Sequence, residues 1–379
     1  MIKKIIAIAA FIAVMAVIVI WANREKPGFT TTPATGVEYE TARVLEVLED
    51  NTTIDETLEN VKRGSTELKI QILTGRYKGD ICFVTNYFSA MYSVDVDAGD
   101  TVSVRLDTTD EGVYTASIYN YNRIPLFYGL IIVFFLTLVI IGGRQGAKAF
   151  LGLAYTVLCI VFILLPLSLQ GFEVIPLTCA IIFVTSALCF YLIGGFQSKT
   201  ISAALGSLCG VLLAALVGEI ATKIGGVTTF QMDEAEALIL VKSTFEIHLR
   251  GLFVSSILIA AMGAVMDVAM TISSALDEVH NLNPERDMKQ LFASGMNIGR
   301  DAMGTMANTL VLAYVGGSLN MMVLIYSYGV SFTQLVNTDF VAIEMIRAVA
   351  GSMGIFLTVP AVSLISAFLL TRKNNIKGD

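Results

Sequence analysis

The sequence predicts a polytopic α-helical membrane protein of about eight transmembrane helices, including an N-terminal signal anchor, with a small extracytoplasmic all-β domain. Two observations predict this class. The 379 residues are 55% hydrophobic and only 15% charged, with a mean hydropathy of +0.71, whereas about a quarter of the residues of soluble domains are charged. Long apolar runs also recur along the chain, and one polar stretch, residues 30–121, interrupts them.

Residues 1–22 predict the signal anchor helix. Lys3 and Lys4 precede an apolar run that continues to Trp21, and this run is about long enough to cross a bilayer. Trp21 suits the interface between membrane and water. A cleaved signal peptide would have a shorter apolar core and a small-residue cleavage site. An uncleaved anchor is therefore the favoured interpretation, with cleavage as the alternative.

Residues 30–121 predict the β domain, which carries 16 Asp and Glu against 7 Lys and Arg. Because of this acidic excess we expect no nucleic-acid partner. Val, Ile, Thr and Tyr alternate with polar residues in five short runs, which turns containing glycine separate, as is typical of strands. Five strands in about ninety residues suit a small closed barrel, OB-like or SH3-like. The five runs are 39–49, 66–75, 79–88, 100–107 and 112–121.

Residues 125–370 predict a domain of seven transmembrane helices, and residues 371–379 a cytoplasmic tail. Each apolar run in this region approaches the length of about 20 residues that a helix needs to span a bilayer. A polar segment, 223–248, divides the first four runs from the last three. The predicted spans are 126–143, 149–169, 175–195, 201–221, 252–276, 302–326 and 348–370.

The charges between the spans predict the orientation in the membrane. Cytoplasmic loops carry an excess of Lys and Arg. The outside turn 170–174 has neither, and the outside segment 223–248 is rich in acids. We therefore expect a multi-pass protein of the plasma membrane with both termini in the cytoplasm and the β domain outside. The basic residues on the cytoplasmic side are Arg144, Lys148, Lys199, Arg286, Lys289, Arg300, Arg372, Lys373 and Lys377.

Asp267 stands inside the apolar run 252–276, among Met, Val and Ala. An acid at the centre of a transmembrane helix costs roughly 2.5–3.5 kcal/mol on insertion scales. Asp267, Thr271 and Ser274 follow helical spacing and share one face. The sequence thus places a polar stripe along an otherwise apolar span.

A second polar stripe follows in the next span, where Asp301, Thr305 and Asn308 lie at i, i+4 and i+7. With a rise of about 1.5 Å per residue, Asp267 and Asn308 would lie at similar depth in adjacent antiparallel helices. The spacing predicts that the two stripes meet, away from lipid. We also expect a helix to begin near Pro284.

These six side chains form a candidate ion or substrate site, and Arg300 a candidate gate. The alternative is structural: Ser, Thr and Asn join transmembrane helices by hydrogen bonds worth about 0.6 kcal/mol each, and Asp301 suits the positive end of a helix dipole. For Asp301 and Arg300 both readings stand equal. For Asp267 function is favoured, because helix association does not require a carboxylate and acids inside membranes tend to mark ion paths.

Other polar residues predict less. Glu344 and Arg347, three apart on a helix, are expected to pair near the outer surface. The five cysteines show no metal-ligand or disulfide spacing, and two histidines are too few for a metal site. We expect no cofactor and no metal. The methionines that cluster around the polar stripes predict adaptable packing rather than copper ligands.

The motifs MGAVMDVAMTISSALDEV (262–279) and GRDAMGTMANTLVLAYVGG (299–317) resemble the YibE/F-like family of bacterial integral membrane proteins. The resemblance covers the region from about Tyr128 to Leu370. It implies a membrane protein, and an N-terminal anchor with an extracytoplasmic domain is similar to the longer members. It implies no catalytic residues.

Three functions compete. The first is a secondary transporter or exporter of a small solute or ion, with Asp267 at its centre. The alternative is a membrane scaffold or sensor whose acidic extracytoplasmic domain binds an envelope partner. An enzyme is not expected, because HExxH and GxSxG are absent and Asp267 and Asp301 differ in depth by roughly 13 Å. Besides the lipid bilayer, a partner membrane protein or a homo-oligomer remains an open expectation.

Overall fold

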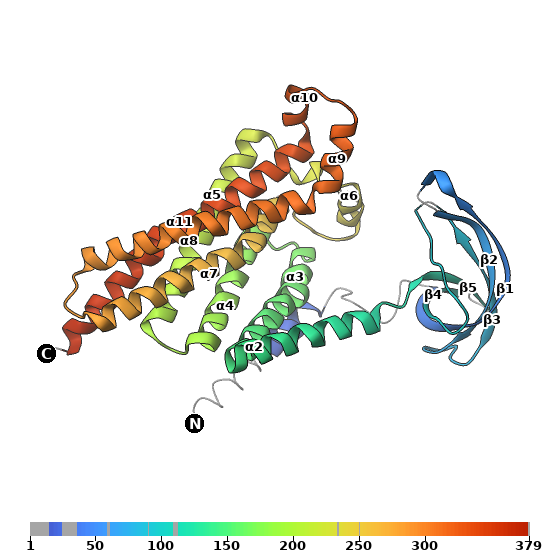
Figure 1. The fold of residues 1–379 in the computed structure, drawn as a ribbon, viewed down its shortest axis with the longest axis horizontal. Helices are drawn as coiled ribbons and strands as arrows, with labels where there is room; N and C mark the ends of the chain where they lie inside the picture. Colours follow the sequence, from blue (N-terminus) through green and yellow to red (C-terminus); the bar gives the residue numbers. More distant parts are fainter. Residues whose placement is uncertain are drawn as a thin grey trace. The chain divides into compact units, whose positions relative to one another are not determined.

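The computed structural model describes residues 15–24, 36–58, 61–89, 91–108, 113–232, 235–249 and 251–377 (Figure 1). The chain divides into two compact units, which are described separately below. One is Phe29–Thr137, and the other is Leu138–Asp379 together with Met1–Gly28.

The first unit holds one antiparallel sheet of five strands in the order β3-β2-β1-β4-β5. Its residues alternate between buried and exposed, as a sheet with one solvated face requires. The long first strand is paired with β4 over Val37–Arg43 and with β2 over Ala42–Asp55, and two register shifts in its pairing with β2 bend it. The strands are β1 (Val37–Asp55), β2 (Val61–Ile72), β3 (Ile81–Phe88), β4 (Thr101–Thr108) and β5 (Tyr114–Tyr121).

This sheet is a half-barrel and not the closed barrel that the sequence predicts. In the described part of the unit no ladder joins β3 to β5. The segment between β3 and β4 bridges them instead: the Tyr92 hydroxyl lies 2.6 Å from the carbonyl oxygen of Tyr119, and the Asp95 amide donates to the Tyr121 hydroxyl at 2.7 Å. Each of the five predicted strands is present, but β1 ends six residues later and β2 begins five residues earlier than predicted.

The second unit is helical. Its helix α2 begins in the other unit, and only the part from Leu138 onward belongs to this one. Its helices are α2 (Ile124–Cys159), the short π-helix η2 (Ile160–Leu164), α3 (Leu165–Leu169), α4 (Val174–Gly194), α5 (Ser198–Gly225), α6 (Ala235–Thr244), α7 (Leu252–Leu282), α8 (Met288–Gly317), α9 (Leu319–Ser327), α10 (Phe332–Val336) and α11 (Asp339–Lys377). Residues 15–22 are also helical, and the rest of the predicted anchor lies outside the described residues.

Within the described ranges, five helices are long and apolar enough to cross a membrane, or six if the bent pair α8 and α9 forms one span. The predicted count of seven after the anchor is therefore not confirmed. The predicted spans 126–143 and 149–169 fall in one helical run, Ile124–Leu169. A break at Gly143, whose φ is +55°, interrupts this run.

Two later helices also differ from their predicted bounds. Helix α8 begins at Met288, not near Pro284, because Asp287 caps it: the Asp287 carboxylate accepts from the Gln290 amide at 2.7 Å. The chain then bends by 59° between α8 and α9, inside the predicted span 302–326. Helix α11 begins at Asp339, nine residues before the predicted start at 348.

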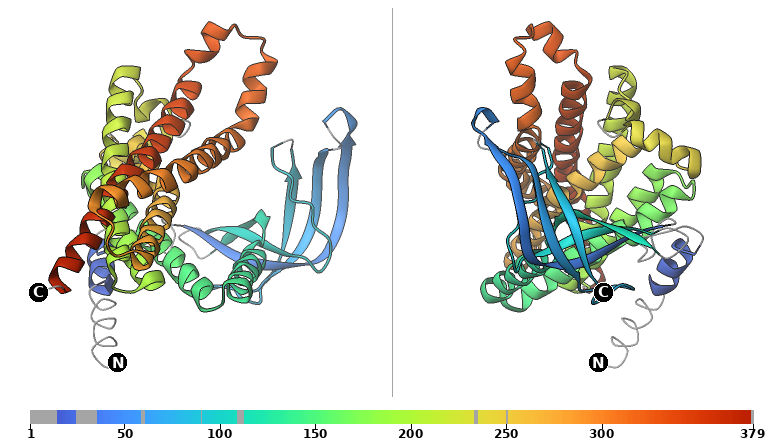
Figure 2. Two further views of the ribbon diagram at one scale, coloured as in Figure 1. Left: turned by 60° about the vertical axis from the view of Figure 1, so that its left-hand side comes forward. Right: turned by 90° about the vertical axis from the view of Figure 1, so that its right-hand side faces the viewer.

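The core of the helical unit lies where α5, α7, α8 and α11 meet (Figure 2). Gly206 and Gly210 on α5 face Val362 and Thr358 on α11 so closely that no Cβ would fit between the helices. Small residues in such contacts allow the backbones of membrane helices to approach. The four helices form the scaffold that carries both polar stripes.

Candidate membrane-embedded polar site

Asp267 lies at the midpoint of α7, fifteen residues from Leu252 and fifteen from Leu282. At about 1.5 Å per residue it is roughly 22 Å from either end of the helix. Its side chain is exposed on the surface of the helical unit, and within the described residues it makes no hydrogen bond or ion pair. The structure thus presents an unpaired carboxylate halfway along a span.

The exposed face of α7 is narrow and carries small or polar side chains. Ala260, Gly263 and Thr271 are exposed beside Asp267, and Ser274 is half-buried. The opposite face packs into the core and is apolar, with Val265, Val268, Ala269, Ile272 and Leu276 buried. Hydrophobic side chains therefore face inward here, and the polar stripe faces outward.

The polar stripe of α8 is exposed as well. Asp301, Thr305 and Asn308 all lie on the surface, together with Arg300. The Thr305 hydroxyl donates to the carbonyl oxygen of Ala302 at 2.9 Å, which is a bond within its own helix. Arg300 donates to Asn297 at 3.4 Å, which makes a weak contact one turn away.

The two stripes do not meet between α7 and α8 as the sequence suggests. In the part of the chain that the structure describes, no hydrogen bond joins Asp267 or Thr271 to Thr305 or Asn308. The helices pack through their apolar faces, where Ile272 and Leu276 lie in the same cluster as Leu291 and Leu310. Because this contact is apolar, the polar stripes face away from it, and both remain on the surface.

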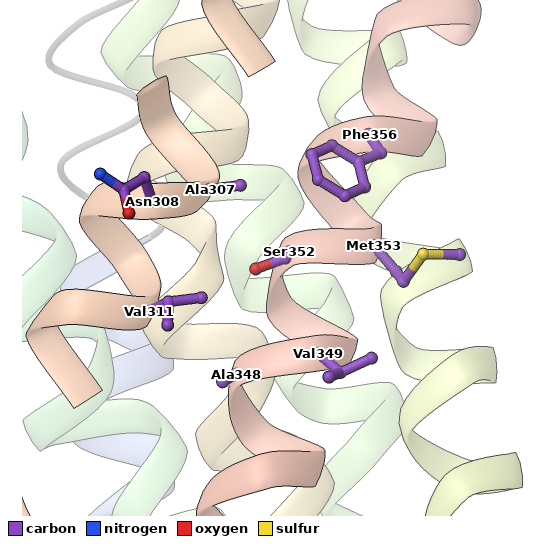
Figure 3. Close-up of a pocket in the computed structure, with 8 residues that line it drawn as sticks. All are labelled: Ala307, Asn308, Val311, Ala348, Val349, Ser352, Met353 and Phe356. Carbon is purple, nitrogen blue, oxygen red and sulfur yellow. The ribbon is translucent and has the colours of Figure 1, made fainter. Parts of the chain in front are cut away.

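Asn308 also borders a pocket of about 340 Å³ between α8 and α11 (Figure 3). Ala307 and Val311 project from α8 toward α11, and the Ser352 hydroxyl points back toward α8, whereas the Asn308 amide extends to the far side. The lining is mostly apolar: Ala307, Asn308, Val311, Ala348, Val349, Ser352, Met353 and Phe356. The pocket suits an apolar group better than a hydrated ion.

The predicted pair of Glu344 and Arg347 is confirmed, and its surroundings add residues that the sequence did not indicate. Arg347 Nη1 donates to Glu344 Oε1 at 2.6 Å. The guanidinium lies over the rings of Phe253 and Tyr314, at 5.7 and 5.9 Å from their centroids. No sequence spacing links α7, α8 and α11, so these aromatic partners could be found only from the fold.

Arg347 Nε and the Tyr314 hydroxyl are both buried without a hydrogen-bond partner. Ser255 and Ser352, on the same three helices, also have buried hydroxyls without partners. The end of the bundle that holds Arg347 therefore contains several unused donors inside an apolar region.

No three His, Cys, Asp or Glu side chains lie close enough to hold a metal ion among the described residues. All five cysteines are free thiols. The methionines near the polar stripes pack against the core, in agreement with the packing role predicted for them.

Comparison with known proteins identifies two matching families. Residues 130–372 match the YibE/F-like protein family, and residues 37–121 match the YibE/F family N-terminal domain. No curated protein and no solved structure matches the chain significantly. The second match covers the β half-barrel, and the first covers nearly all of the helical unit and contains both polar stripes. The chain belongs to the YibE/F family.

Proposed function

We propose that this chain is a multi-pass protein of the plasma membrane and a secondary transporter or exporter, with its ion or substrate site around Asp267. In this proposal residues 1–22 anchor the chain, both termini are cytoplasmic and the β half-barrel is extracytoplasmic. The asymmetry of Lys and Arg between the predicted loops supports this orientation.

The observation that carries the proposal is the unpaired carboxylate of Asp267 halfway along α7. A carboxylate in hydrocarbon without a partner is unfavourable by several kcal/mol, roughly, so a cation or a proton would bind to it strongly. Thr271, one turn from Asp267 on the same exposed face of α7, would add a neutral oxygen to such a site. Hard cations prefer oxygen ligands of this kind.

Arg300 and Asp301 would control the cytoplasmic end of this path. They are adjacent and exposed at the same end of the stripe that leads through Thr305 to Asn308. Opposite charges there can pair with each other or with an ion in passage. Under this proposal they act as a gate and not as the binding site.

A thermal-shift screen of the purified full chain tests this proposal. The probes are Na⁺, Mn²⁺, Cu⁺ and protons, and the proteins are the wild type, Asp267→Asn and Asp277→Asn. A ligand at a hundred times its Kd stabilises the native state by about 2.7 kcal/mol. We expect one probe to raise the unfolding temperature of wild type and Asp277→Asn, but not of Asp267→Asn.

Asp277 is the matched control because it lies on the same helix, ten residues nearer its end, and loses the same charge. If Asp267→Asn responds to every probe as the wild type does, Asp267 takes no part in ion binding and the proposal is wrong.

The β half-barrel supports a second candidate, a scaffold or sensor that binds an envelope partner. The edge strand β3 turns Ile81, Phe83 and Tyr87 outward, with exposed fractions of 52%, 70% and 68%. Exposed apolar side chains on an edge strand are a known route to association with another chain.

Replacing Phe83 and Tyr87 together by Ser separates the two candidates. A scaffold or sensor would lose its partner and its biological effect, because both side chains lie on the recognition surface. A transporter would keep the ion-dependent thermal shift, since neither residue belongs to the helical unit.

A further inference from the structure

We infer that a second copy of this chain covers the polar faces of α7 and α8, and that the two copies share one ion site containing both Asp267 carboxylates. The shared-site part of this inference rests on the proposed function, whereas the interface between copies does not.

The first step concerns the membrane. No water is present in the bilayer core to satisfy an exposed polar group. Asp267, Thr271 and Asn308 are exposed on the single chain, and none forms a hydrogen bond within the described residues. Facing lipid would leave a carboxylate, a hydroxyl and an amide without partners. Another protein surface must therefore cover them.

The second step concerns shape. A Cβ atom added to Gly263 or to Gly304 would meet nothing within 4 Å, so there is open space beside both helices. The buried glycines of α5, in contrast, are in contact with α11. Small residues on both helices allow another backbone to approach closely. The polar face is thus shaped for a helix, and none of the helices that the structure describes in the single chain lies against it.

The third step identifies the occupant. The most exposed apolar part of the chain, residues 126–141 of α2, is an unsuitable cover because Tyr128 and Thr137 are its only side chains with hydroxyls. Thr137 already donates to the carbonyl oxygen of Val133 at 2.8 Å. This segment brings almost nothing that could satisfy Asp267.

A second copy, in contrast, is complementary in charge and in hydrogen bonding. A two-fold interface brings the same patch of both copies together. This patch has an acceptor in Asp267 and donors in Asn308 and Thr271, and it carries both charges at one end, in Arg300 and Asp301. Arg300 of one copy then lies beside Asp301 of the other, because the two copies have the same orientation in the membrane.

The symmetry also determines the site. When the two-fold axis is parallel to the membrane normal, the two Asp267 side chains lie at one depth and face each other. Two carboxylates repel unless a proton or a metal cation lies between them. The interface therefore brings together four carboxylate oxygens and the neighbouring hydroxyls, which are ligands that suit a hard cation. A single copy provides only half of this set.

Cross-linking of the full chain in its membrane tests the interface. Cys82, Cys159, Cys179, Cys189 and Cys209 are first replaced by Ala or Ser, and Thr271→Cys is then introduced and treated with a short bis-maleimide. The matched control is Leu212→Cys, an exposed side chain near the middle of α5. We expect a product of twice the chain mass from Thr271→Cys and only background from Leu212→Cys.

A steric variant completes the test. Gly263→Leu, added to Thr271→Cys, is expected to reduce the cross-link to the Leu212→Cys level, while the unfolding temperature of the single chain stays the same because the space beside Gly263 is open. Equal products from Thr271→Cys and Leu212→Cys, an undiminished cross-link in Gly263→Leu, or a product with the mass of a different protein would each overturn the inference.

These outcomes are separate from those of the proposed function. If Thr271→Cys cross-links as expected but Asp267→Asn keeps every ion-dependent shift, the interface stands and the transport proposal fails. If the ion-dependent shift requires Asp267 while the chain remains single in the membrane, the transport proposal stands and the shared site is wrong.

Discussion

The contact between α5 and α11 predicts how strongly one methyl group destabilises the bundle. In Gly210→Ala, the new Cβ would overlap Oγ1 of Thr358 and would lie 3.0 Å from Thr358 Cβ and 3.3 Å from the carbonyl oxygen of Gly354. Thr358 is fully buried, and its hydroxyl donates to the Gly354 carbonyl at 2.7 Å. The neighbour therefore has no free space into which it can move.

Two responses are open to the structure, and both are unfavourable. Rotation of Thr358 leaves its buried hydroxyl without a partner, at a cost of about 1–3 kcal/mol, while the Gly354 carbonyl keeps its backbone bond within α11. Separation of the helices loses packing along their contact. Overpacked cores are destabilised by a similar amount, about 1–3 kcal/mol. Replacing Gly by Ala in a helix returns at most about 1 kcal/mol. We expect a net destabilisation of about 1–2 kcal/mol.

Equilibrium unfolding in mixed micelles measures this free energy, with Gly316→Ala as the control. A Cβ on Gly316 would meet nothing within 4 Å, so that variant is expected to be neutral or slightly stabilising. Thr358→Ala in the Gly210→Ala background removes the overlapping oxygen. The double variant should therefore be more stable than the sum of the single effects by about 1–2 kcal/mol. Additive effects, or a neutral Gly210→Ala, would refute the close contact between these helices.

Two further predictions concern other parts of the chain. Burial, with the Cys82 thiol and the Asp80 carboxylate nearby, raises the pKa of Tyr114 to about 12. Subtracting the ultraviolet titration curve of Tyr114→Phe from that of the wild type isolates this tyrosine, and the midpoint of the difference should lie there. A midpoint near the ordinary value of about 10 would contradict this burial. Because the folded pKa lies above the unfolded one, this contribution to stability is full below about pH 10 and is lost as the pH rises through 12. In Arg347→Lys the ion pair with Glu344 can re-form, but the planar contact with the two rings cannot. We therefore expect the free energy of unfolding to fall by about 1–2 kcal/mol in the same assay. An unchanged free energy would exclude a role for the rings.

The sequence predicted those features that depend on local pattern. The five runs of alternating residues form five strands. Glu344 and Arg347, three residues apart on a helix, form an ion pair with 2.6 Å between Oε1 and Nη1. Both follow from periodicity within one element. The open edge of the sheet does not, because closure depends on whether β3 and β5 can exchange hydrogen bonds, and these strands are distant in the sequence.

The bounds of the helices were predicted less well, because hydropathy detects only the apolar part of a helix. Helix α8 starts at Met288, in a polar segment where the capping box of Asp287 and Gln290 is the determining signal. The predicted spans 126–143 and 149–169 placed a loop after Gly143. Gly143, whose φ is +55°, does divide α2 into two helical segments where the first predicted span ends, but no loop separates the segments.

Whether the polar stripes of α7 and α8 face each other could not be predicted from the sequence. Spacing places Asp267, Thr271 and Ser274 on one face of α7, but it does not say which neighbour that face meets. The apolar face of α7 is the wider one, and it faces α5, α8 and α11. Close packing of this face against its neighbours fixes the rotation of the helix and turns Asp267 outward.

Glycines in this chain therefore occur in two environments that look alike in the sequence. Gly206 and Gly210 lie against the side chains of α11, whereas Gly263 and Gly304 lie beside open space on the faces that carry Asp267 and Asn308. In both environments a small residue permits the approach of a helix, but among the described residues only the first environment has one against it. The open environment coincides with side chains that lipid cannot satisfy, and it is there that the proposed second copy would contribute a helix from the same face.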